Sequence, residues 1–289
     1  MGYRSVFREG LFDGQVVVVT GAGSGIGRCT AHELASLGAR VALIGRKREK
    51  LEKVKGEIGE DGGEAELWCL DIRVEEDVQR VISEVLERFS RIDGLVNNAG
   101  GQYPAPLAQI TQKGFEAVVR TNLTGGFLMS REVYTQWMAE HGGAIVNIVA
   151  DMWLGMPGMG HSGAARAGMV NFTETAALEW GPSNVRVNAV APGWIASSGF
   201  DTYGEGMREV IRSMNEKVPL GRVGTESEVS AAIAFLLCEA AAFISGATLR
   251  IDGAAPNYKR IWELPPHEKP APVYQGFHRA ETPKVLDDE

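Results

Sequence analysis

The stretch that decides the fold is "QVVVVTGAGSGIG", residues 15–27. Residues 15–19 are a short apolar run typical of a buried strand, and a helical pattern extends from about Gly25 to Leu37. The glycines between them permit a tight turn and let the backbone approach a pyrophosphate at the helix N-terminus. The order of strand, glycine turn and helix predicts a dinucleotide-binding unit, with an ordinary glycine turn as the alternative.

More strand-like runs follow along the chain, separated by helix-like segments. The apolar runs cover residues 40–44, 65–69, 94–97, 144–149, 185–190 and 247–251. Continuous Val and Ile runs between helices are typical of a parallel sheet covered on both faces. A capping box, "TESE" at residues 225–228, starts the helix before the last strand. The sequence therefore predicts an α/β fold with a doubly wound parallel sheet in a single domain.

The composition excludes several classes of protein. With 289 residues, 44% of them hydrophobic, the chain can bury a large core. The net charge of −8 argues against nucleic-acid binding, and no apolar run approaches the roughly 18 residues of a membrane span. The N-terminus lacks the apolar core of a signal peptide, and the three cysteines show no pairing pattern. We expect a cytoplasmic protein without metal, nucleic-acid or membrane partners.

The chain changes character after about residue 254. Residues 254–289 contain half of the twelve prolines together with Tyr258, Trp262, Tyr274 and Phe277. A frayed tail is one interpretation. The aromatic content favours an irregular arm that packs on its own or a neighbouring subunit.

The end of the second predicted strand indicates which dinucleotide binds. An NAD-binding protein usually has Asp or Glu at this place for the ribose 2′-hydroxyl. This chain has "GRKREK" at residues 45–50, which offers the space of Gly45 and the positive charges of Arg46 and Lys47. Such charges suit a 2′-phosphate and predict NADPH as the cofactor. The alternative is a solvated start to the next helix.

Four motifs together resemble the short-chain dehydrogenase/reductase family. They are "TGAGSGIG" (20–27), "NNAG" (97–100), "TNLTGG" (121–126) and "APGWI" (191–195). The resemblance extends from about residue 12 to residue 253, with the order and spacing of the motifs preserved. It implies a seven-stranded Rossmann-type sheet with a substrate lid at about residues 194–222.

The resemblance also implies which residues contact the cofactor. In the glycine loop these are Gly21, Ser24, Gly25, Ile26 and Gly27; beside the adenine, Asp71 and Ile72; along the cofactor, Asn98, Ala99 and Gly100; and beside the nicotinamide, Pro192, Gly193 and Ile195. Asn122 matches the family's catalytic asparagine.

The chain departs from the family at its usual catalytic pair, Tyr-x-x-x-Lys. The two positions are Ser162 and Arg166, and Ala150 or Asp151 stands in place of the family's serine. A serine hydroxyl is far too weak an acid to replace the tyrosine, whereas Arg166 can still bind the nicotinamide ribose but cannot release a proton. Ordinary alcohol–ketone chemistry is therefore disfavoured.

One branch of the family departs in this way, namely the 2,4-dienoyl-CoA reductases and the peroxisomal trans-2-enoyl-CoA reductases. The stretches "EHGGAIVNIV", "HSGAARAG" and "NFTETAALEW" most resemble the latter. Those enzymes reduce a carbon–carbon double bond conjugated to a thioester. Charge develops on the thioester oxygen, which needs hydrogen-bond donors more than it needs an acid.

Several residues are candidates for the donor and for the acid that protonates the α-carbon. Ser162, or a water held by Asn122, would supply the donor. Asp151 is the candidate acid if burial raises its pKa, with a capping or ion-paired carboxylate as the alternative. His161 and Tyr103 are further candidates, although a loop histidine without a role is the favoured interpretation of His161.

The remaining features concern the substrate and the assembly. Five apolar residues within 152–159, "MWLGMPGM", suit an acyl chain or the plain core. The lid has Met207 and Met214 with Arg208, Arg212 and Lys217, which suits a CoA thioester or an exposed basic helix face. The alternatives to an enoyl-thioester reductase are a dehydrogenase of branched terpenoid-like alcohols or aldehydes and a non-catalytic nucleotide-binding protein. Family resemblance implies a homodimer or homotetramer.

Overall fold

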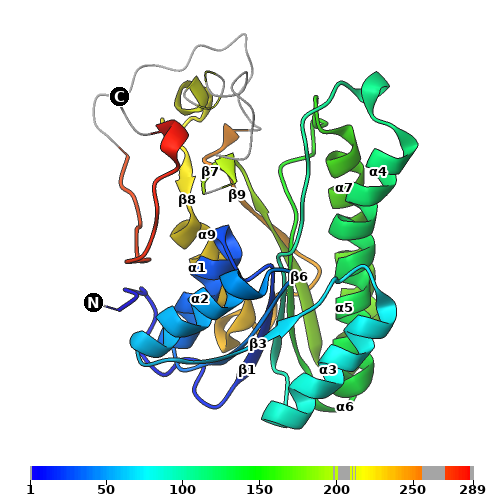
Figure 1. Cartoon of the computed structure of the whole chain (residues 1–289), viewed down its shortest axis with the longest axis vertical. Coiled ribbons are helices and arrows are strands. Elements are labelled where there is room, and N and C mark those ends of the chain that lie inside the picture. Colours follow the sequence, from blue (N-terminus) through cyan, green and yellow to red (C-terminus); the bar gives the residue numbers. More distant parts are fainter. Residues whose placement is uncertain are drawn as a thin grey trace.

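The computed structural model describes residues 2–197, 199–200, 209, 211, 213–255 and 271–286. Its centre is a seven-stranded parallel sheet of order β3-β2-β1-β4-β5-β6-β9 (Figure 1). The strands are β1 (Val16–Thr20), β2 (Arg40–Gly45), β3 (Glu64–Cys69), β4 (Gly94–Asn97), β5 (Gly143–Ile148), β6 (Val185–Pro192) and β9 (Thr248–Ile251). All seven predicted strands are present, which confirms the predicted fold class.

Helices cover both faces of the sheet (Figure 1). One face has α1 (Gly25–Ser36), α2 (Arg48–Glu60) and α9 (Glu226–Leu237); the other has α3 (Glu75–Phe89), α4 (Gln112–Val119), α5 (Gly125–Val133), α6 (Ala139–His141) and α7 (Gly160–Trp180). Two π-helical turns, Arg120–Thr124 and Tyr134–Met138, join α4 to α5 and α5 to α6. Within the described residues, no helix is long and apolar enough to cross a membrane.

The side chains of β1 show why the sheet needs both layers. All five residues of β1 are buried. Val17 and Val19 pack into the core beneath α1, α2 and α9, whereas Val16 and Val18 pack into the core beneath α3, α5 and α7. Successive side chains of a strand point to opposite faces, so an unbroken apolar run is stable only between two layers.

A small two-stranded sheet lies outside the main one and was not predicted from the sequence. It pairs β7 (Ile195–Ala196) with β8 (Gly224–Thr225), at the two ends of the predicted lid. Directly after β8, the capping box forms as predicted, with reciprocal hydrogen bonds between Thr225 and Glu228. Within the lid, a short 3-10 helix spans Ser213–Lys217; Met207, Arg208 and Arg212 lie outside the described residues.

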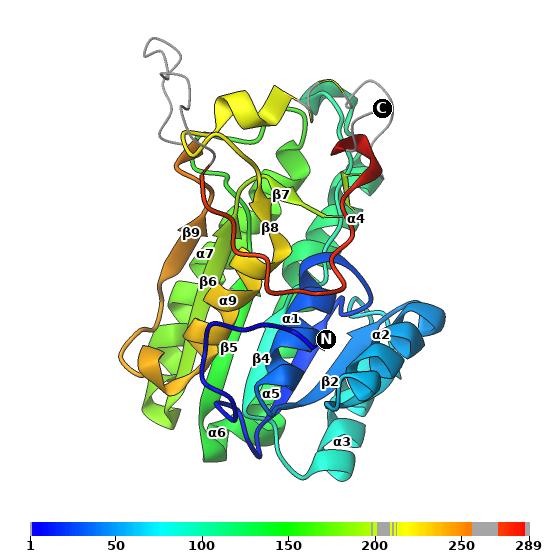
Figure 2. The same ribbon diagram turned by 90° about the vertical axis from the view of Figure 1, so that its left-hand side faces the viewer.

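The described part of the C-terminal arm, residues 271–286, crosses the surface in a U-shaped path (Figure 2). Its descending limb follows β8 and α9, where Thr225 donates to the carbonyl oxygen of Tyr274 at 2.8 Å. At the turn, Phe277 is buried and Arg279 pairs with Glu60 and Asp61 of the α2 end. The last short helix, Lys284–Leu286, returns to the lid. Tyr258 and Trp262 lie outside the described residues.

Val285 is the residue that connects this arm to the lid. It is buried in a small cluster with Phe200, Ile211 and Met214. Phe200 also lines the cavity described below. The arm therefore spans from the α1–α2 surface to the wall of the cavity.

Candidate active site

The glycine loop lies at the carboxyl ends of β1 and β4, where the order of strands reverses. This crevice is where open α/β sheets bind their ligands. Gly21 and Gly25 have φ values of +66° and +59°, a region that favours glycine. Ser24 stands directly before α1, in the N-cap position.

Gly27 is the tightest point of the loop. A Cβ atom there would lie 2.4 Å from both Asn98 Nδ2 and the carbonyl oxygen of Gly21. Asn98 in turn donates from Nδ2 to the carbonyl oxygen of Thr20 at 2.9 Å, and Thr20 Oγ1 accepts the Ala99 N–H at 2.9 Å. The first turn of α1 and the end of β4 thus fix the loop with contacts that leave no room for a side chain.

A cavity of about 230 Å³ opens on the β2 side of this loop. Of the predicted cofactor residues it is lined by Gly21, Ser24, Arg46, Asp71, Ile72, Asn98, Ala99 and Gly100. Arg46 is exposed at its rim, and Lys47 is not among the lining residues. Arg73, which the sequence analysis missed, lines the cavity and forms a bidentate pair with Asp71. This guanidinium holds the pKa of Asp71 below its usual range.

A second cavity, of about 350 Å³, shares Asn98 and Gly100 with the first and continues along the same edge of the sheet. The predicted residues Ile26, Asp151, Arg166, Pro192, Gly193 and Ile195 line it. Met156, Met159, Trp194 and Phe200 form much of its apolar wall. Leu154, which the sequence analysis also proposed for this wall, is 80% exposed and lies away from the cavity.

Arg166 is a half-buried cation that lines this second cavity. It donates from one terminal nitrogen to the carbonyl oxygen of Ile148, while its Nε has no hydrogen-bond partner among the described residues. Burial lowers the pKa of the guanidinium to about 10, so it stays charged at neutral pH. A buried polar atom without a partner is costly, and a ligand that accepts from Arg166 would relieve that cost.

Asp151 lines the same cavity and is half-buried. Burial raises the pKa of its carboxyl group, and the negative charge of Asp252 acts in the same direction. The nearby Arg250 opposes the rise but does not cancel it. This is the environment that the sequence analysis required of a carboxylic acid able to donate a proton.

Ser162 and Asn122 occupy positions other than those expected of residues that touch the substrate. Neither lines the cavity, and both are buried. Ser162 Oγ donates to Gln102 Oε1 at 2.6 Å. Asn122 accepts the Gly101 N–H at 2.8 Å and donates to the Gly101 carbonyl oxygen at 3.0 Å. In this structure the Ser162 hydroxyl therefore faces Gln102 rather than the cavity lining, and its role as the donor to the substrate stays a prediction.

The other two candidates also lie outside the cavity lining. His161 is fully buried, and its Nδ1 accepts the Ser162 backbone N–H at 2.8 Å. Tyr103 packs edge-on against the His161 ring, with the two centroids 4.6 Å apart. Gln102, which no sequence motif singled out, stands beside Tyr103 in "GGQYPAP" and does line the cavity.

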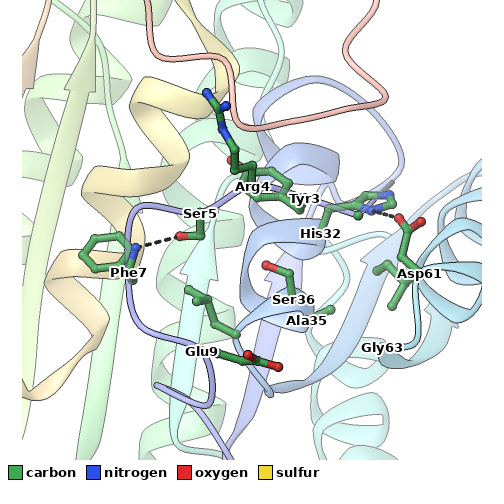
Figure 3. Close-up of a pocket in the computed structure, with 13 residues that line it drawn as sticks. Tyr3, Arg4, Ser5, Phe7, Glu9, His32, Ala35, Ser36, Asp61 and Gly63 are labelled. Atoms are coloured by element: carbon green, nitrogen blue, oxygen red, sulfur yellow. Dashed lines mark hydrogen bonds and ion pairs between the residues drawn. The ribbon is translucent and has the colours of Figure 1, made fainter.

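A third cavity, of about 360 Å³, lies between the N-terminal segment and α1 and α2 (Figure 3). Its lining includes the C-terminal ends of α1 and α2, so it is far from the glycine loop. Its polar groups bind one another. His32 faces Asp61 at 3.6 Å, and Ser5 Oγ donates to Glu33 at 2.8 Å. This cavity is therefore a polar contact region between the N-terminal segment and the two helices, away from the glycine loop.

Comparison with known proteins identifies the family. Residues 21–254 match the family model described as "Enoyl-(Acyl carrier protein) reductase". The chain is a short-chain dehydrogenase/reductase. Members of this family are oxidoreductases that use nicotinamide dinucleotides.

Individual relatives include reductases of unsaturated thioesters. A probable 2,4-dienoyl-CoA reductase of Bacillus subtilis is 37% identical, over 83% of this chain and 95% of its own. A peroxisomal 2,4-dienoyl-CoA reductase of Danio rerio is 34% identical, over 88% and 85%. Among solved structures, the citronellol catabolism dehydrogenase AtuB of Pseudomonas aeruginosa is 62% identical with a TM-score of 0.80, over 88% of this chain and 99% of that one.

Proposed function

We propose that the protein reduces the carbon–carbon double bond of a 2-enoyl thioester with NADPH. The observation that carries this proposal is the lining of the second cavity. Among the described residues, this lining presents a cation, Arg166, and a carboxyl group with a raised pKa, Asp151, but no tyrosine hydroxyl. A conjugated double bond needs oxyanion stabilisation and a proton at carbon, which these groups can serve.

The residues present fit a dinucleotide. The glycine loop admits backbone approach to a pyrophosphate, and the Arg166 guanidinium, which lines the second cavity, suits the hydroxyl groups of the nicotinamide ribose. Pro192, Gly193 and Ile195 would line the nicotinamide side. When bound, the cofactor supplies hydride to the β-carbon of the substrate.

The preference for NADPH rests on charge at the first cavity. Arg46 at its rim and Arg73 in its wall are both cations, and Lys47 follows directly in the chain. Arg73 is engaged with Asp71, which leaves Arg46 as the main candidate for the 2′-phosphate. Charge-assisted hydrogen bonds of this kind contribute roughly 1.5–3 kcal/mol.

Asp151 is proposed as the acid that protonates the α-carbon. Its raised pKa keeps a larger fraction protonated near neutral pH than an ordinary aspartate would have. Arg166 is proposed to orient the cofactor, because an arginine cannot serve as an acid at neutral pH. The apolar wall of Met156, Met159 and Phe200 would receive the acyl chain.

A second candidate function is oxidation or reduction of branched, terpenoid-like alcohols or aldehydes. The 62% identity to a citronellol catabolism dehydrogenase favours it. The two candidate functions would share a substrate skeleton if the natural thioester has a branched, terpenoid-like acyl chain. Neither requires the missing tyrosine if Asp151 supplies the proton.

The deciding experiment measures NADPH oxidation by the purified protein with four substrates: crotonyl-CoA, a long straight 2-enoyl-CoA, a branched 2-enoyl-CoA and citronellal. Oxidation of citronellol with NADP⁺ is measured in parallel. We expect the highest kcat/KM with a 2-enoyl-CoA. Faster turnover of citronellal or citronellol than of every thioester would replace the first function by the second. Tight NADPH binding without turnover of any of them would indicate a non-catalytic protein.

We also propose that the protein works as a cytoplasmic homodimer or homotetramer. Its three cysteines are free thiols, consistent with a reducing compartment. Phe127 of α5, Leu178 of α7 and Leu249 of β9 are exposed apolar side chains on the elements through which family members pair. Light scattering that shows a stable 31 kDa monomer at micromolar concentration would refute the assembly.

A further inference from the structure

Arg250, near the carboxyl end of β9, is held by two neighbours beside the second cavity. Its Nε donates to Asp252 Oδ2 at 2.8 Å. Its guanidinium carbon lies 5.3 Å from the centroid of the Trp153 ring, within the range of a cation–π contact. Trp153 follows Asp151 by two residues, and its backbone N–H donates to the Asp151 carboxylate. Arg250 and its two neighbours therefore form a group next to the proposed acid.

Asp252 is itself fixed at both carboxylate oxygens. Oδ2 accepts from Arg250, and Oδ1 accepts the Ala254 backbone N–H at 2.9 Å. The Asp252 side chain is only 8% exposed. Its backbone packs closely on Gly193, where an added Cβ would lie 2.8 Å from the Asp252 Cα atom. Asp252 is therefore a rigid anchor for the Arg250 guanidinium.

Asp151 is the carboxylate with which Arg250 would pair if this anchor were lost. β9 lies beside β6, and β6 lies beside β5, which Asp151 follows, so both residues are at the same edge of the sheet. The charge of Arg250 acts on the Asp151 carboxyl group and favours its ionised form. One terminal nitrogen of Arg250, Nη2, has no hydrogen-bond partner among the described residues. A guanidinium released from Asp252 would therefore gain by pairing with Asp151.

We infer that Asp252 is a positioning residue for the proposed acid: its pair with Arg250 keeps the guanidinium from forming an ion pair with Asp151. The inference rests on the proposed function. Hydride addition at the β-carbon leaves an enolate, whose electron pair forms the new C–H bond at the α-carbon. The O–H bond of Asp151 breaks in this step, and the carboxylate regains a proton from solvent. An ion pair with Arg250 would hold Asp151 ionised, with no proton to give.

Among the described residues, the charged groups around Asp151 come from two parts of the fold. Arg250 and Asp252, from β9 and the turn after it, act on the carboxyl group in opposite directions. Arg166 of α7 lines the same cavity. Arg166 is unchanged in every variant of the test, so any change in the titration of Asp151 comes from the Arg250–Asp252 pair.

The test compares the pH profiles of kcat for the best 2-enoyl-CoA in wild type, Asp252→Asn, Arg250→Met and Arg250→Lys. The wild-type kcat is expected to fall as pH rises through the pKa of Asp151, because the protonated form donates. Asp252→Asn should move this fall to lower pH by about 0.5–1 pH unit, since Arg250 is no longer neutralised. Arg250→Met should move it to higher pH by a similar amount. Arg250→Lys keeps the charge and should stay near wild type.

Arg222→Met is the matched control. Arg222 lines a neighbouring cavity of about 380 Å³ together with Arg250, and it is paired with Glu228 as Arg250 is with Asp252. Its pH profile should coincide with that of wild type. The NADPH dissociation constant and the melting temperature are measured for every variant. A merely structural role of Asp252 would lower kcat or the melting temperature without moving the fall in opposite directions in the Asp252 and Arg250 variants.

An infrared titration tests the same inference without a substrate. It follows the C=O stretch of the protonated Asp151 carboxyl group, identified as the band that Asp151→Asn lacks. We expect its midpoint to move to lower pH in Asp252→Asn and to higher pH in Arg250→Met. Unchanged midpoints, or shifts in the same direction, would overturn the inference. Opposite shifts of the midpoint with kcat profiles that do not follow them would instead overturn Asp151 as the acid of the proposed function.

Discussion

The nucleotide end and the reaction end of this site lie side by side along one edge of the sheet, yet they are built in different ways. At the nucleotide end, the backbone makes the site. Gly21, Gly25 and Gly27 provide space and unusual φ angles, and Asn98 fixes them through hydrogen bonds. At the reaction end, side chains line the cavity, and Ser162 and Arg166 stand at the two positions that the family resemblance aligns with its acid–base pair.

This difference teaches where the chain tolerates change. A loop formed by closely packed backbone loses its conformation when a side-chain atom is added at one of its glycines. The neighbouring atoms are themselves backbone or hydrogen-bonded amides and cannot move aside. A side-chain-built site can exchange one set of groups for another and keep its fold, while its chemistry changes. The following predictions test that contrast, from the largest expected effect to the smallest.

Gly27→Ala should abolish measurable NADPH binding and lower the free energy of unfolding by about 1–3 kcal/mol. The added Cβ would lie 2.4 Å from Asn98 Nδ2 and from the Gly21 carbonyl oxygen, so the loop must move. Gly56→Ala in α2 is the matched control, because a Cβ there has nothing within 4 Å and alanine favours the helix. Fluorescence titration and urea unfolding measure both. A Gly27→Ala protein that binds NADPH normally would contradict a backbone-built nucleotide end.

Asp151→Asn should lower kcat for a 2-enoyl thioester by about 100-fold or more, in the range typical of a lost general acid. The raised pKa also sets the direction of the pH profile. The protonated form donates, so wild-type kcat should fall as pH rises through that pKa. The asparagine variant should lack this fall. A wild-type profile that is flat, or that rises with pH, would exclude Asp151 as the acid.

Arg166→Met should lower the affinity for NADPH and at the same time raise the melting temperature. It removes the buried guanidinium from the ribose site, so NADPH affinity should drop by about 10- to 150-fold, equivalent to roughly 1.5–3 kcal/mol. The melting temperature should rise, because the variant no longer buries an unsatisfied Nε and a cation in the absence of ligand. Differential scanning calorimetry without cofactor measures the second effect. A fall in melting temperature would mean that the hydrogen bond from Arg166 to the Ile148 carbonyl oxygen stabilises the fold by more than burial of the guanidinium destabilises it.

Arg46→Asp should weaken NADPH binding about 10-fold while NADH binding stays the same or improves. Arg46 is exposed, so its contribution lies at the low end for a charge-assisted contact. Dissociation constants for both cofactors are measured in wild type and variant. A wild type that already prefers NADH would end the proposed preference for NADPH.

Val285→Asp should have the smallest effect of these variants on the kinetics, because Val285 contacts the cavity through Phe200. The charge would be placed in the buried contact among Val285, Phe200 and Met214, which should detach the arm from the lid. We expect a severalfold higher KM for long acyl-CoA with NADPH affinity unchanged. Lys284→Asp puts the same residue at the neighbouring exposed position and should have no effect. Equal KM values in both variants would show that the arm does not shape the cavity.

Much of the fold follows from local patterns. The apolar runs predicted central strands such as β1 and β4 because a strand that is buried on both faces needs apolar residues at every position, whereas the edge strands β3 and β9 are only partly buried. The glycine loop was recognisable because its backbone requirements exclude other residues, so its spacing carries the information. The capping box at Thr225 is likewise a contact between residues three apart. The pair β7–β8 had no such signal, because two residues per strand are too few to form a pattern.

The sequence by itself therefore determined the doubly wound sheet, its order of elements and the serine and arginine at positions 162 and 166. The tertiary structure decided what the replacement residues face. Ser162 meets Gln102 across 60 residues of chain, and the arm meets α2 across more than 200, distances at which no local pattern constrains a pairing. Only the packing of α7 against the loop after β4 turns the Ser162 hydroxyl away from the cavity. The same packing buries Arg166 without a partner for its Nε among the described residues, because burial is a property of all surrounding elements together.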